Sequence, residues 1–210
     1  MGFFDRLRAR GPGRPPEASF WAWFATHSDR LLAVTSADEP VCDELMRQLQ
    51  KVGGGLWFEF GPDEAGRREF VVSADGAREL FPAVRRLVAA APDLTRWTVI
   101  AFRPRKGTDF VIEMGGRKVG HEDVWFREEP DGDRVGLTLY LRGLDAKNED
   151  VLGQASFIML DTALGEYDVV TKVGFVERRP LPADPASEGL RPFAQLPDAV
   201  DALATPRRGD

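Results

Sequence analysis

Residues 124–141 read VWFREEPDGDRVGLTLYL, and this segment carries the strongest β-hairpin signal in the chain. Apolar residues occupy alternate positions in its second half, at Val135, Leu137, Leu139 and Leu141. Such alternation is typical of a strand that buries one face. Proline suits the first corner of a type I turn and glycine its exit, so Pro130-Asp131-Gly132 is expected to reverse the chain. The segment therefore predicts an antiparallel hairpin with strands at 124–127 and 135–141.

Further strands and helices are expected on both sides of this hairpin. The expected strands lie at 56–60, 70–72, 98–103, 110–114 and 173–177, and the expected helices at 16–31, 38–52, 76–91, 148–164 and 196–204. The strands come mostly in pairs, with helices before, between and after them. This order favours an α+β fold: a single domain with a largely antiparallel sheet and helices packed on it.

Composition places the globular domain between two ends of different character. Residues 1–15 form a basic amphipathic extension and a Gly/Pro linker, with Phe3, Phe4 and Leu7 set among arginines. Residues 181–210 are expected to be a proline-rich tail that clings to the surface or is loose, because six of the fifteen prolines fall in the last 31 residues. The globular α+β domain is therefore expected at 16–180.

Composition also limits the compartment and the class of partner. The 210 residues carry a formal net charge of −6, whereas a nucleic-acid binder needs a basic face, so no nucleic-acid partner is expected. A single cysteine cannot form an internal disulfide, and the sequence shows neither a secretory leader nor an apolar run long enough to cross a bilayer. A cytoplasmic location is expected.

The residues that most often carry enzymatic chemistry are scarce. The chain has two histidines, His27 and His121, and one cysteine, Cys42, none in a recognisable catalytic or metal-binding spacing. The sequence therefore predicts no catalytic residue, no metal ligand and no cofactor from these residue types.

Acidic residues near the end of the 148–164 helix are the first candidate site. Asp161 lies at the helix end, and Glu166 and Asp168 follow Gly165, with Tyr167 between them. Converging carboxylates could bind a divalent cation or act as a general acid. The same residues could also solvate a turn or contact a partner. The Tyr167 hydroxyl could bind a ligand, or the ring could pack in the fold with its hydroxyl hydrogen-bonded.

Basic residues form a second candidate. Arg103, Arg105 and Lys106 are followed by Arg117 and Lys118, and a hairpin between the two groups would bring them close. Such a patch could hold a phosphate or a carboxylate, or it could pair with neighbouring acids. Among the five tryptophans, Trp21 or Trp125 would mark a binding surface if exposed.

Five phrases give the chain a resemblance to a family of uncharacterised bacterial proteins of similar length. They are FWAWF (20–24), LWFEFG (56–61), VVSADGARELFPAV (71–84), AFRPR (101–105) and LDTALGEYDVVTKVGFVE (160–177). The resemblance covers residues 17 to about 197 and implies a bacterial cytosolic protein with one continuous domain. It assigns no activity and no role to any residue.

Three functions remain open at the level of sequence. The leading hypothesis is a non-catalytic binding or regulatory module with a protein partner, using some of Asp161, Glu166, Tyr167, Asp168, Arg103, Arg105 and Trp125. The second is a carboxylate-based enzyme, with or without a divalent metal, that acts through Asp161, Glu166 and Asp168. The third is a membrane-peripheral protein that makes weak surface contact through residues 1–10. The sequence leaves the ligand and the oligomeric state open.

Overall fold

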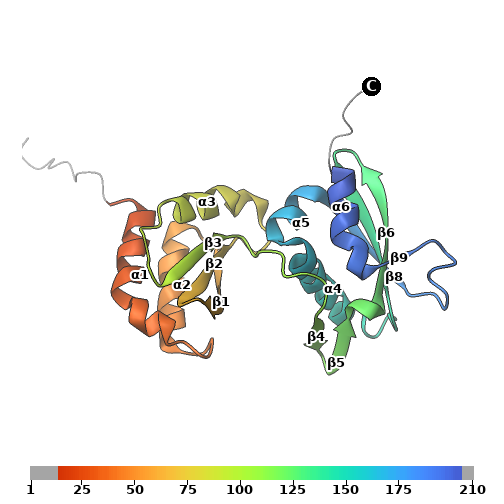
Figure 1. The fold of residues 1–210 in the computed structure, drawn as a ribbon, viewed down its shortest axis with the longest axis horizontal. Coiled ribbons are helices and arrows are strands. Elements are labelled where there is room, and N and C mark those ends of the chain that lie inside the picture. Colours follow the sequence, from red (N-terminus) through yellow and green to blue (C-terminus); the bar gives the residue numbers. More distant parts are fainter. Residues whose placement is uncertain (1–13, 205–210) are drawn as a thin grey trace, which may run out of the picture. The chain divides into compact units, whose positions relative to one another are not determined.

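The computed structural model describes residues 14–204, so the predicted membrane contact at residues 1–10 lies outside the described residues. The described chain forms two compact units. Unit 1 comprises residues 14–74 and Glu79–Ala101, and unit 2 comprises Asp75–Arg78 and residues 102–204. Each unit has its own sheet and its own helices (Figure 1).

Unit 1 is built on a three-stranded sheet with the order β1-β2-β3. Its strands are β1 (Trp57–Glu64), β2 (Arg67–Ser73) and β3 (Trp97–Ala101), and its helices are α1 (Pro16–Leu32), α2 (Pro40–Val52) and α3 (Phe81–Ala89), the last preceded by the 3-10 turn η1 (Arg78–Leu80). β1 and β2 form an antiparallel hairpin, whereas β2 and β3 are parallel and α3 provides the crossover between them. α1 packs against α2, and α3 packs against β2 and β3.

Aromatic rings fill the core of unit 1. Phe24 on α1 lies 4.8 Å from the Phe70 ring and 5.0 Å from the Trp97 ring, and all three side chains are buried. Trp21 is buried as well, and its indole Nε1 donates a hydrogen bond of 2.8 Å to the Leu87 carbonyl. Trp21 is therefore part of the core, so the exposure that would have made it a candidate for a binding surface is not found.

The turn of the first hairpin is tighter than the gap between the strands expected at 56–60 and 70–72. Strand pairing continues to Glu64 opposite Arg67, with an irregularity between Phe60 and Asp63. Ala65 and Gly66 alone close the hairpin, both with positive φ, as in a type I′ turn. β1 tolerates Pro62 because it is the edge strand and the register slips there.

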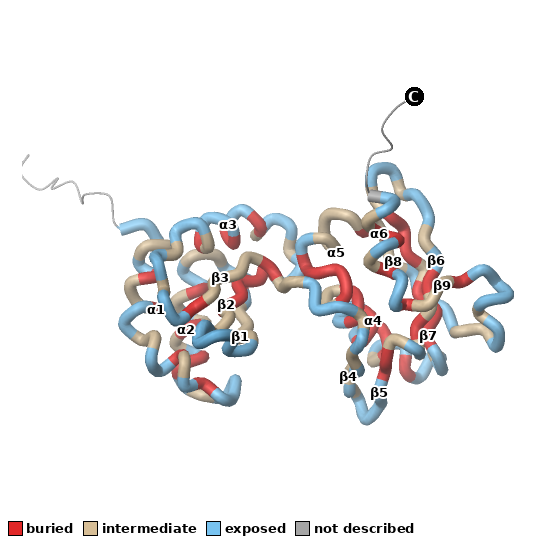
Figure 2. The backbone as a smooth tube through the Cα atoms, in the orientation of Figure 1, coloured by how far each residue is buried: buried red, intermediate tan, exposed pale blue. Residues whose placement is uncertain are grey.

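Unit 2 contains a four-stranded sheet with the order β8-β7-β6-β9 and a separate two-stranded hairpin, β4-β5. The strands are β4 (Val111–Met114), β5 (Arg117–Gly120), β6 (Val124–Asp131), β7 (Arg134–Leu141), β8 (Val173–Pro180) and β9 (Arg191–Pro192); 3-10 turns η2 (His121–Asp123) and η3 (Phe193–Gln195) precede β6 and α6. The helices are α4 (Glu149–Leu164), α5 (Glu166–Lys172) and α6 (Leu196–Ala204). α5 and α6 pack against the large sheet, and α4 packs against β4, α5 and α6. Buried residues of β6, β7, α4 and α6 form one hydrophobic core cluster, and Figure 2 shows buried residues in red.

The core of unit 2 extends past residue 180, where the sequence analysis ended the domain. Phe193, Leu196 and Val200 are fully buried and belong to the same cluster as Phe126 and Leu160. The apolar residues of this last segment recur at helical spacing, and the surrounding prolines obscured that pattern. Residues 190–200 are thus part of the folded unit.

The α+β class, mostly antiparallel pairing and the helices near 16–31, 38–52 and 148–164 are confirmed. The strands lie in three sheets, and β5 and α5 were not predicted. Asp131 pairs with Arg134, so Gly132-Asp133 closes the central hairpin two residues later than expected. Within residues 14–204, none of the helices has both the length and the apolarity needed to cross a bilayer.

Candidate functional site

The predicted acidic and basic residues meet in unit 2. Asp161 lies in the last turn of α4, Glu166 and Asp168 lie in the first turn of α5, and Arg103 and Arg105 lie on the segment after β3. Together with Asp75, Lys172 and Asp201, which contact them, they form what we call the arginine–carboxylate cluster. The acidic candidate site and part of the basic candidate site, which were predicted separately from the sequence, thus form a single cluster in the structure.

Gly165 lets the Arg103–Arg105 segment approach the junction of α4 and α5. Its φ is 77°, in the left-handed region, and a Cβ atom there would lie 3.1 Å from the Arg103 carbonyl oxygen. The Glu166 amide donates a hydrogen bond of 3.0 Å to that same carbonyl. Glycine is therefore required at this position for both its conformation and its small size.

Glu166 and Arg103 form the buried half of the cluster. Glu166 is 0% exposed, and its two carboxylate oxygens accept hydrogen bonds from the amides of Gly76 (3.2 Å) and Arg103 (3.1 Å). The Arg103 side chain bonds Asp161 Oδ2 through Nε at 2.6 Å, and both of its terminal nitrogens lie 3.3 Å from Asp75 Oδ1. Each charged side chain of this half therefore has hydrogen-bond or ion-pair partners, as burial requires.

Arg105 and Lys172 form the second half, where they hold Asp168 and Asp201. Arg105 makes two hydrogen bonds of 2.8 and 2.9 Å to Asp201 and one to Asp168, and it donates through Nε to the Leu164 carbonyl at 2.8 Å. Lys172 Nζ lies 2.9 Å from Asp201 and 3.1 Å from Asp168. Because Asp201 is on α6 and Lys172 on α5, these ion pairs connect the two helices.

The pairing shifts the pKa values of this second half toward the charged forms. Hydrogen bonds from Arg105 and then Lys172 lower the pKa of Asp201 below its ordinary 3.8, against the opposing effect of burial. The hydrogen bonds with Asp201 and Asp168 raise the pKa of Arg105. Burial works against the charged form of Lys172, but its bonds to the same two carboxylates outweigh this and raise its pKa.

The arrangement does not match the expectation of a carboxylate site for a divalent cation. Asp161, Glu166 and Asp168 lie close together in the fold, but each accepts hydrogen bonds from arginine side chains or backbone amides. No group of three or more potential metal ligands occurs in the described part of the chain. Salt pairing with acidic surroundings, one of the two interpretations of Arg103 and Arg105, is the arrangement found.

The two aromatic candidates lie in different surroundings. Tyr167 is 39% exposed on α5, and its ring lies 5.4 Å from that of Phe102. Trp125 is half-buried on β6, where it stands opposite Tyr140 of β7 and Pro192 of β9 in the strand register. Neither residue lines the pocket described next.

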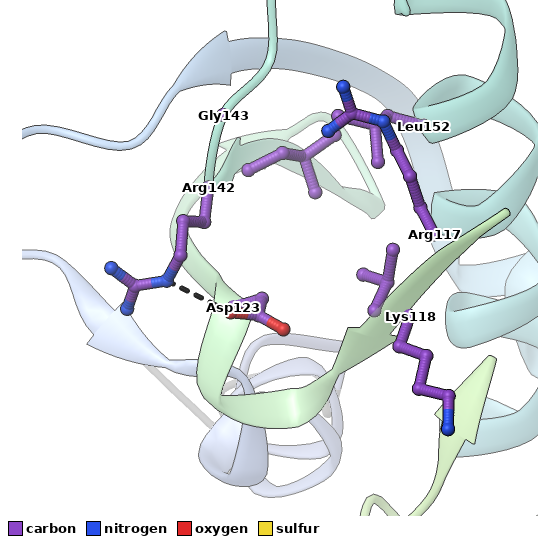
Figure 3. A pocket seen from close by; sticks show the side chains of 8 residues that line it. Arg117, Lys118, Asp123, Arg142, Gly143 and Leu152 are labelled. Carbon is purple, nitrogen blue, oxygen red and sulfur yellow. Dashed lines mark hydrogen bonds and ion pairs between the residues drawn. The ribbon is translucent and has the colours of Figure 1, made fainter. Parts of the chain in front are cut away.

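The remaining basic residues, Arg117 and Lys118, lie on β5 and line a pocket of about 290 Å³ in unit 2 (Figure 3). We call it the basic pocket. Its eight lining residues are Arg117, Lys118, Val119, Asp123, Leu141, Arg142, Gly143 and Leu152. Val119, Leu141 and Leu152 belong to the core of unit 2, so the core forms the floor of the pocket. β5, η2, the end of β7 and α4 meet around it.

The charged residues of the basic pocket are engaged to different degrees. Arg142 Nε donates to Asp123 Oδ1 at 2.9 Å, and the other Asp123 oxygen accepts from the Gly120 amide at 3.1 Å. Lys118 lies 3.9 Å from Glu113 and extends away from the opening (Figure 3). The Arg117 guanidinium reaches over the opening (Figure 3), and it has no hydrogen-bond or ion-pair partner among residues 14–204.

Sequence reasoning identified Arg117 and Lys118 but missed Asp123, Arg142 and Leu152. The missed residues lie up to 35 positions along the chain from Arg117, and only the β4-β5 hairpin and the start of α4 bring them together. Gly115-Gly116 was the available signal, since two consecutive glycines with positive φ close that hairpin.

Comparison of the chain with models of protein families, with curated proteins and with solved structures finds no match. The resemblance to a bacterial family therefore stays a prediction. The evidence on function is therefore the chemistry of the arginine–carboxylate cluster and of the basic pocket.

Proposed function

We propose that this protein is a non-catalytic binding module that holds a small anionic ligand in the basic pocket of unit 2. The observation that carries the proposal is the contrast between the two sites. In the arginine–carboxylate cluster each cationic side chain is already engaged by carboxylates. In the basic pocket, a guanidinium without a partner overhangs an apolar floor.

The chemistry of the pocket supports binding rather than catalysis. Three cationic side chains and one carboxylate line it, and that carboxylate, Asp123, already accepts from Arg142 and from the Gly120 amide. A general acid or base needs to reach a reacting proton, and a nucleophile needs a neighbouring base. Guanidinium groups instead recognise carboxylates and phosphates by charge-assisted, often bidentate hydrogen bonds.

The volume of the pocket supports a small ligand. Drug-sized ligands occupy pockets of roughly 300–1,000 Å³, and the basic pocket, at about 290 Å³, lies at the lower end of that range. The protein partner expected from sequence would then bind elsewhere on the molecule or respond to the bound anion.

A thermal-shift panel tests this proposal. Acetate, benzoate, inorganic phosphate and citrate are added to the full chain at constant ionic strength, and at least one is expected to raise Tm, because a ligand that prefers the folded state stabilises it. The double variant Arg117→Gln/Lys118→Gln is expected to lose that shift. The matched control, Arg47→Gln/Lys51→Gln, removes the same charges from the exposed side of α2 and should keep it. Absence of any Arg117-dependent shift across the panel would contradict the proposal.

A further inference from the structure

We infer that the ligand of the basic pocket is a monoanionic carboxylate attached to a compact apolar group, such as a benzoate-like aromatic acid. This inference rests on the proposed function and assigns a chemical class to the ligand. It is drawn from three features of the pocket: the single available guanidinium, the carboxylate in the wall and the apolar floor.

The number of available cationic groups argues for one negative charge. Of the three cationic side chains in the lining, Arg142 is held by Asp123, and Lys118 extends away from the opening toward Glu113 (Figure 3). Arg117 alone reaches over the opening without a partner among the residues that the structure describes. One planar guanidinium fits one planar carboxylate through two parallel hydrogen bonds.

Asp123 argues against a doubly charged ligand. Its carboxylate lies in the pocket wall, where it is fixed by the Arg142 side chain and the Gly120 amide. A phosphate monoester carries close to two negative charges at neutral pH. Its second charge would face Asp123 without a second unengaged cation to offset the repulsion. A carboxylate avoids this cost.

The floor of the pocket argues for an apolar body next to the carboxylate. Leu141 and Leu152 are only 2% and 3% exposed, and they belong to the packed core, so the floor is preformed. Arg117 and Leu152 both line the pocket (Figure 3), so a carboxylate bound to Arg117 would direct its substituent toward the apolar side chains. A cavity of about 150 Å³ accommodates benzene, and this pocket, at about 290 Å³, has room for a ring together with its carboxylate.

Calorimetric titration with four probes tests each part of the inference. Benzoate combines the charge with an apolar ring, benzamide keeps the ring without the charge, acetate keeps the charge without the ring, and inorganic phosphate supplies a dianion. Benzoate is expected to bind most tightly, with Kd on the order of 1 mM or lower for a ligand of this size. Benzamide and acetate should each bind at least about tenfold more weakly, because each lacks one of the two contacts.

Substitutions at Arg117 connect this selectivity to the pocket. Arg117→Gln is expected to weaken benzoate binding by about tenfold or more, the effect of losing a charge-assisted hydrogen bond. Arg117→Lys keeps the charge but loses the planar fork, so its Kd should lie between those of the wild type and Arg117→Gln. Arg47→Gln, on the exposed side of α2 in unit 1, is the matched control and should bind like the wild type. Because Arg117 is exposed and unpaired among the described residues, the unliganded Tm should not change.

The outcomes separate the inference from the proposed function. Phosphate binding that is tighter than benzoate binding and depends on Arg117 would overturn the carboxylate inference while supporting an anion-binding module. Equal affinities for benzoate and benzamide would show that the negative charge of the ligand does not contribute to binding. Equal affinities for benzoate and acetate would show that the apolar floor does not contribute. Either result would overturn the inference. If none of the anions binds, both the inference and the proposed function fail.

Discussion

At the scale of single residues, the buried carboxylate of Glu166 is the most constrained group in the cluster. Both of its oxygens accept backbone hydrogen bonds, one from Gly76 and one from Arg103. These donors lie on the two segments, Asp75–Arg78 and the start of Phe102–Asp210, where the chain joins unit 2. Glu166 therefore holds both entry points of the chain in place within that unit.

Replacing Glu166 with alanine is expected to lower the free energy of unfolding by about 3 kcal/mol. The change leaves two amides without their acceptor and removes a negative charge from the surroundings of the Arg103 guanidinium. Urea denaturation checks the value. Glu113→Ala is the control, since its side chain is 69% exposed and its only ion pair among residues 14–204 is with Lys118 at 3.9 Å, and it should change stability by less than about 0.5 kcal/mol. Similar effects of the two substitutions would show that Glu166 has no special structural role.

At the scale of secondary-structure elements, the ion pairs of Asp201 attach α6 to the rest of unit 2. Arg105 on the segment after β3 and Lys172 on α5 both contact this one carboxylate. α6 also buries Leu196, Ala199 and Val200, so apolar packing supplies most of its attachment and the ion pairs add to it.

The lowered pKa of Asp201 predicts a dependence of stability on pH. A group whose pKa falls on folding binds more protons in the unfolded state, so its contribution is fully present well above the ordinary value of 3.8 and is lost as pH falls below that value. Asp201→Asn should therefore cost about 1 kcal/mol or less near neutral pH, and this cost should be clearly smaller near about pH 3, where the unfolded chain already binds the proton. Urea denaturation at both pH values measures the difference.

Asp133→Asn serves as the control for this experiment, because Asp133 lies in the exposed turn of the central hairpin and forms no ion pair among residues 14–204. It should have little effect at either pH. A cost of Asp201→Asn that stays constant across the pH range would mean that the carboxylate charge contributes nothing.

The elements with regular hydrophobic patterns were predictable from sequence, and the others were not. α4 and β7 carry long apolar periodicities, and glycine ends α4, so both were placed to within a residue or two. β5 reads RKVG and has a single apolar side chain to indicate a strand. α5 has only seven residues, and its Val-Val-Thr run favours a strand by local propensity, so its packing against α4, β7 and β8 explains the helix.

At the scale of the whole molecule, the sequence predicted five residues of the cluster, but it missed Asp75, Lys172 and Asp201 and did not predict how the charges pair. Asp161, Glu166, Asp168, Arg103 and Arg105 were all candidates, but pairing them requires α4, α5 and the segment after β3 to converge. Spacing along the chain carries no information about such convergence. The basic pocket was less predictable still, because its walls come from four elements.

The overall charge has a consequence for binding by the basic pocket. The chain carries a formal net charge of −6, so its long-range field repels anions, and attraction to Arg117 acts only at short range. Added salt screens both effects. The specificity of the pocket for its ligand therefore depends on direct contacts rather than on electrostatic steering.

Backbone amide NMR during a benzoate titration tests most directly whether the basic pocket, rather than the arginine–carboxylate cluster, is the ligand site. The account predicts saturable shifts at the amides of residues 117–119, 123, 141–143 and 152, and their loss in Arg117→Gln. Saturable shifts centred on residues 103–105 and 161–168, or no saturable shifts in unit 2, would contradict it.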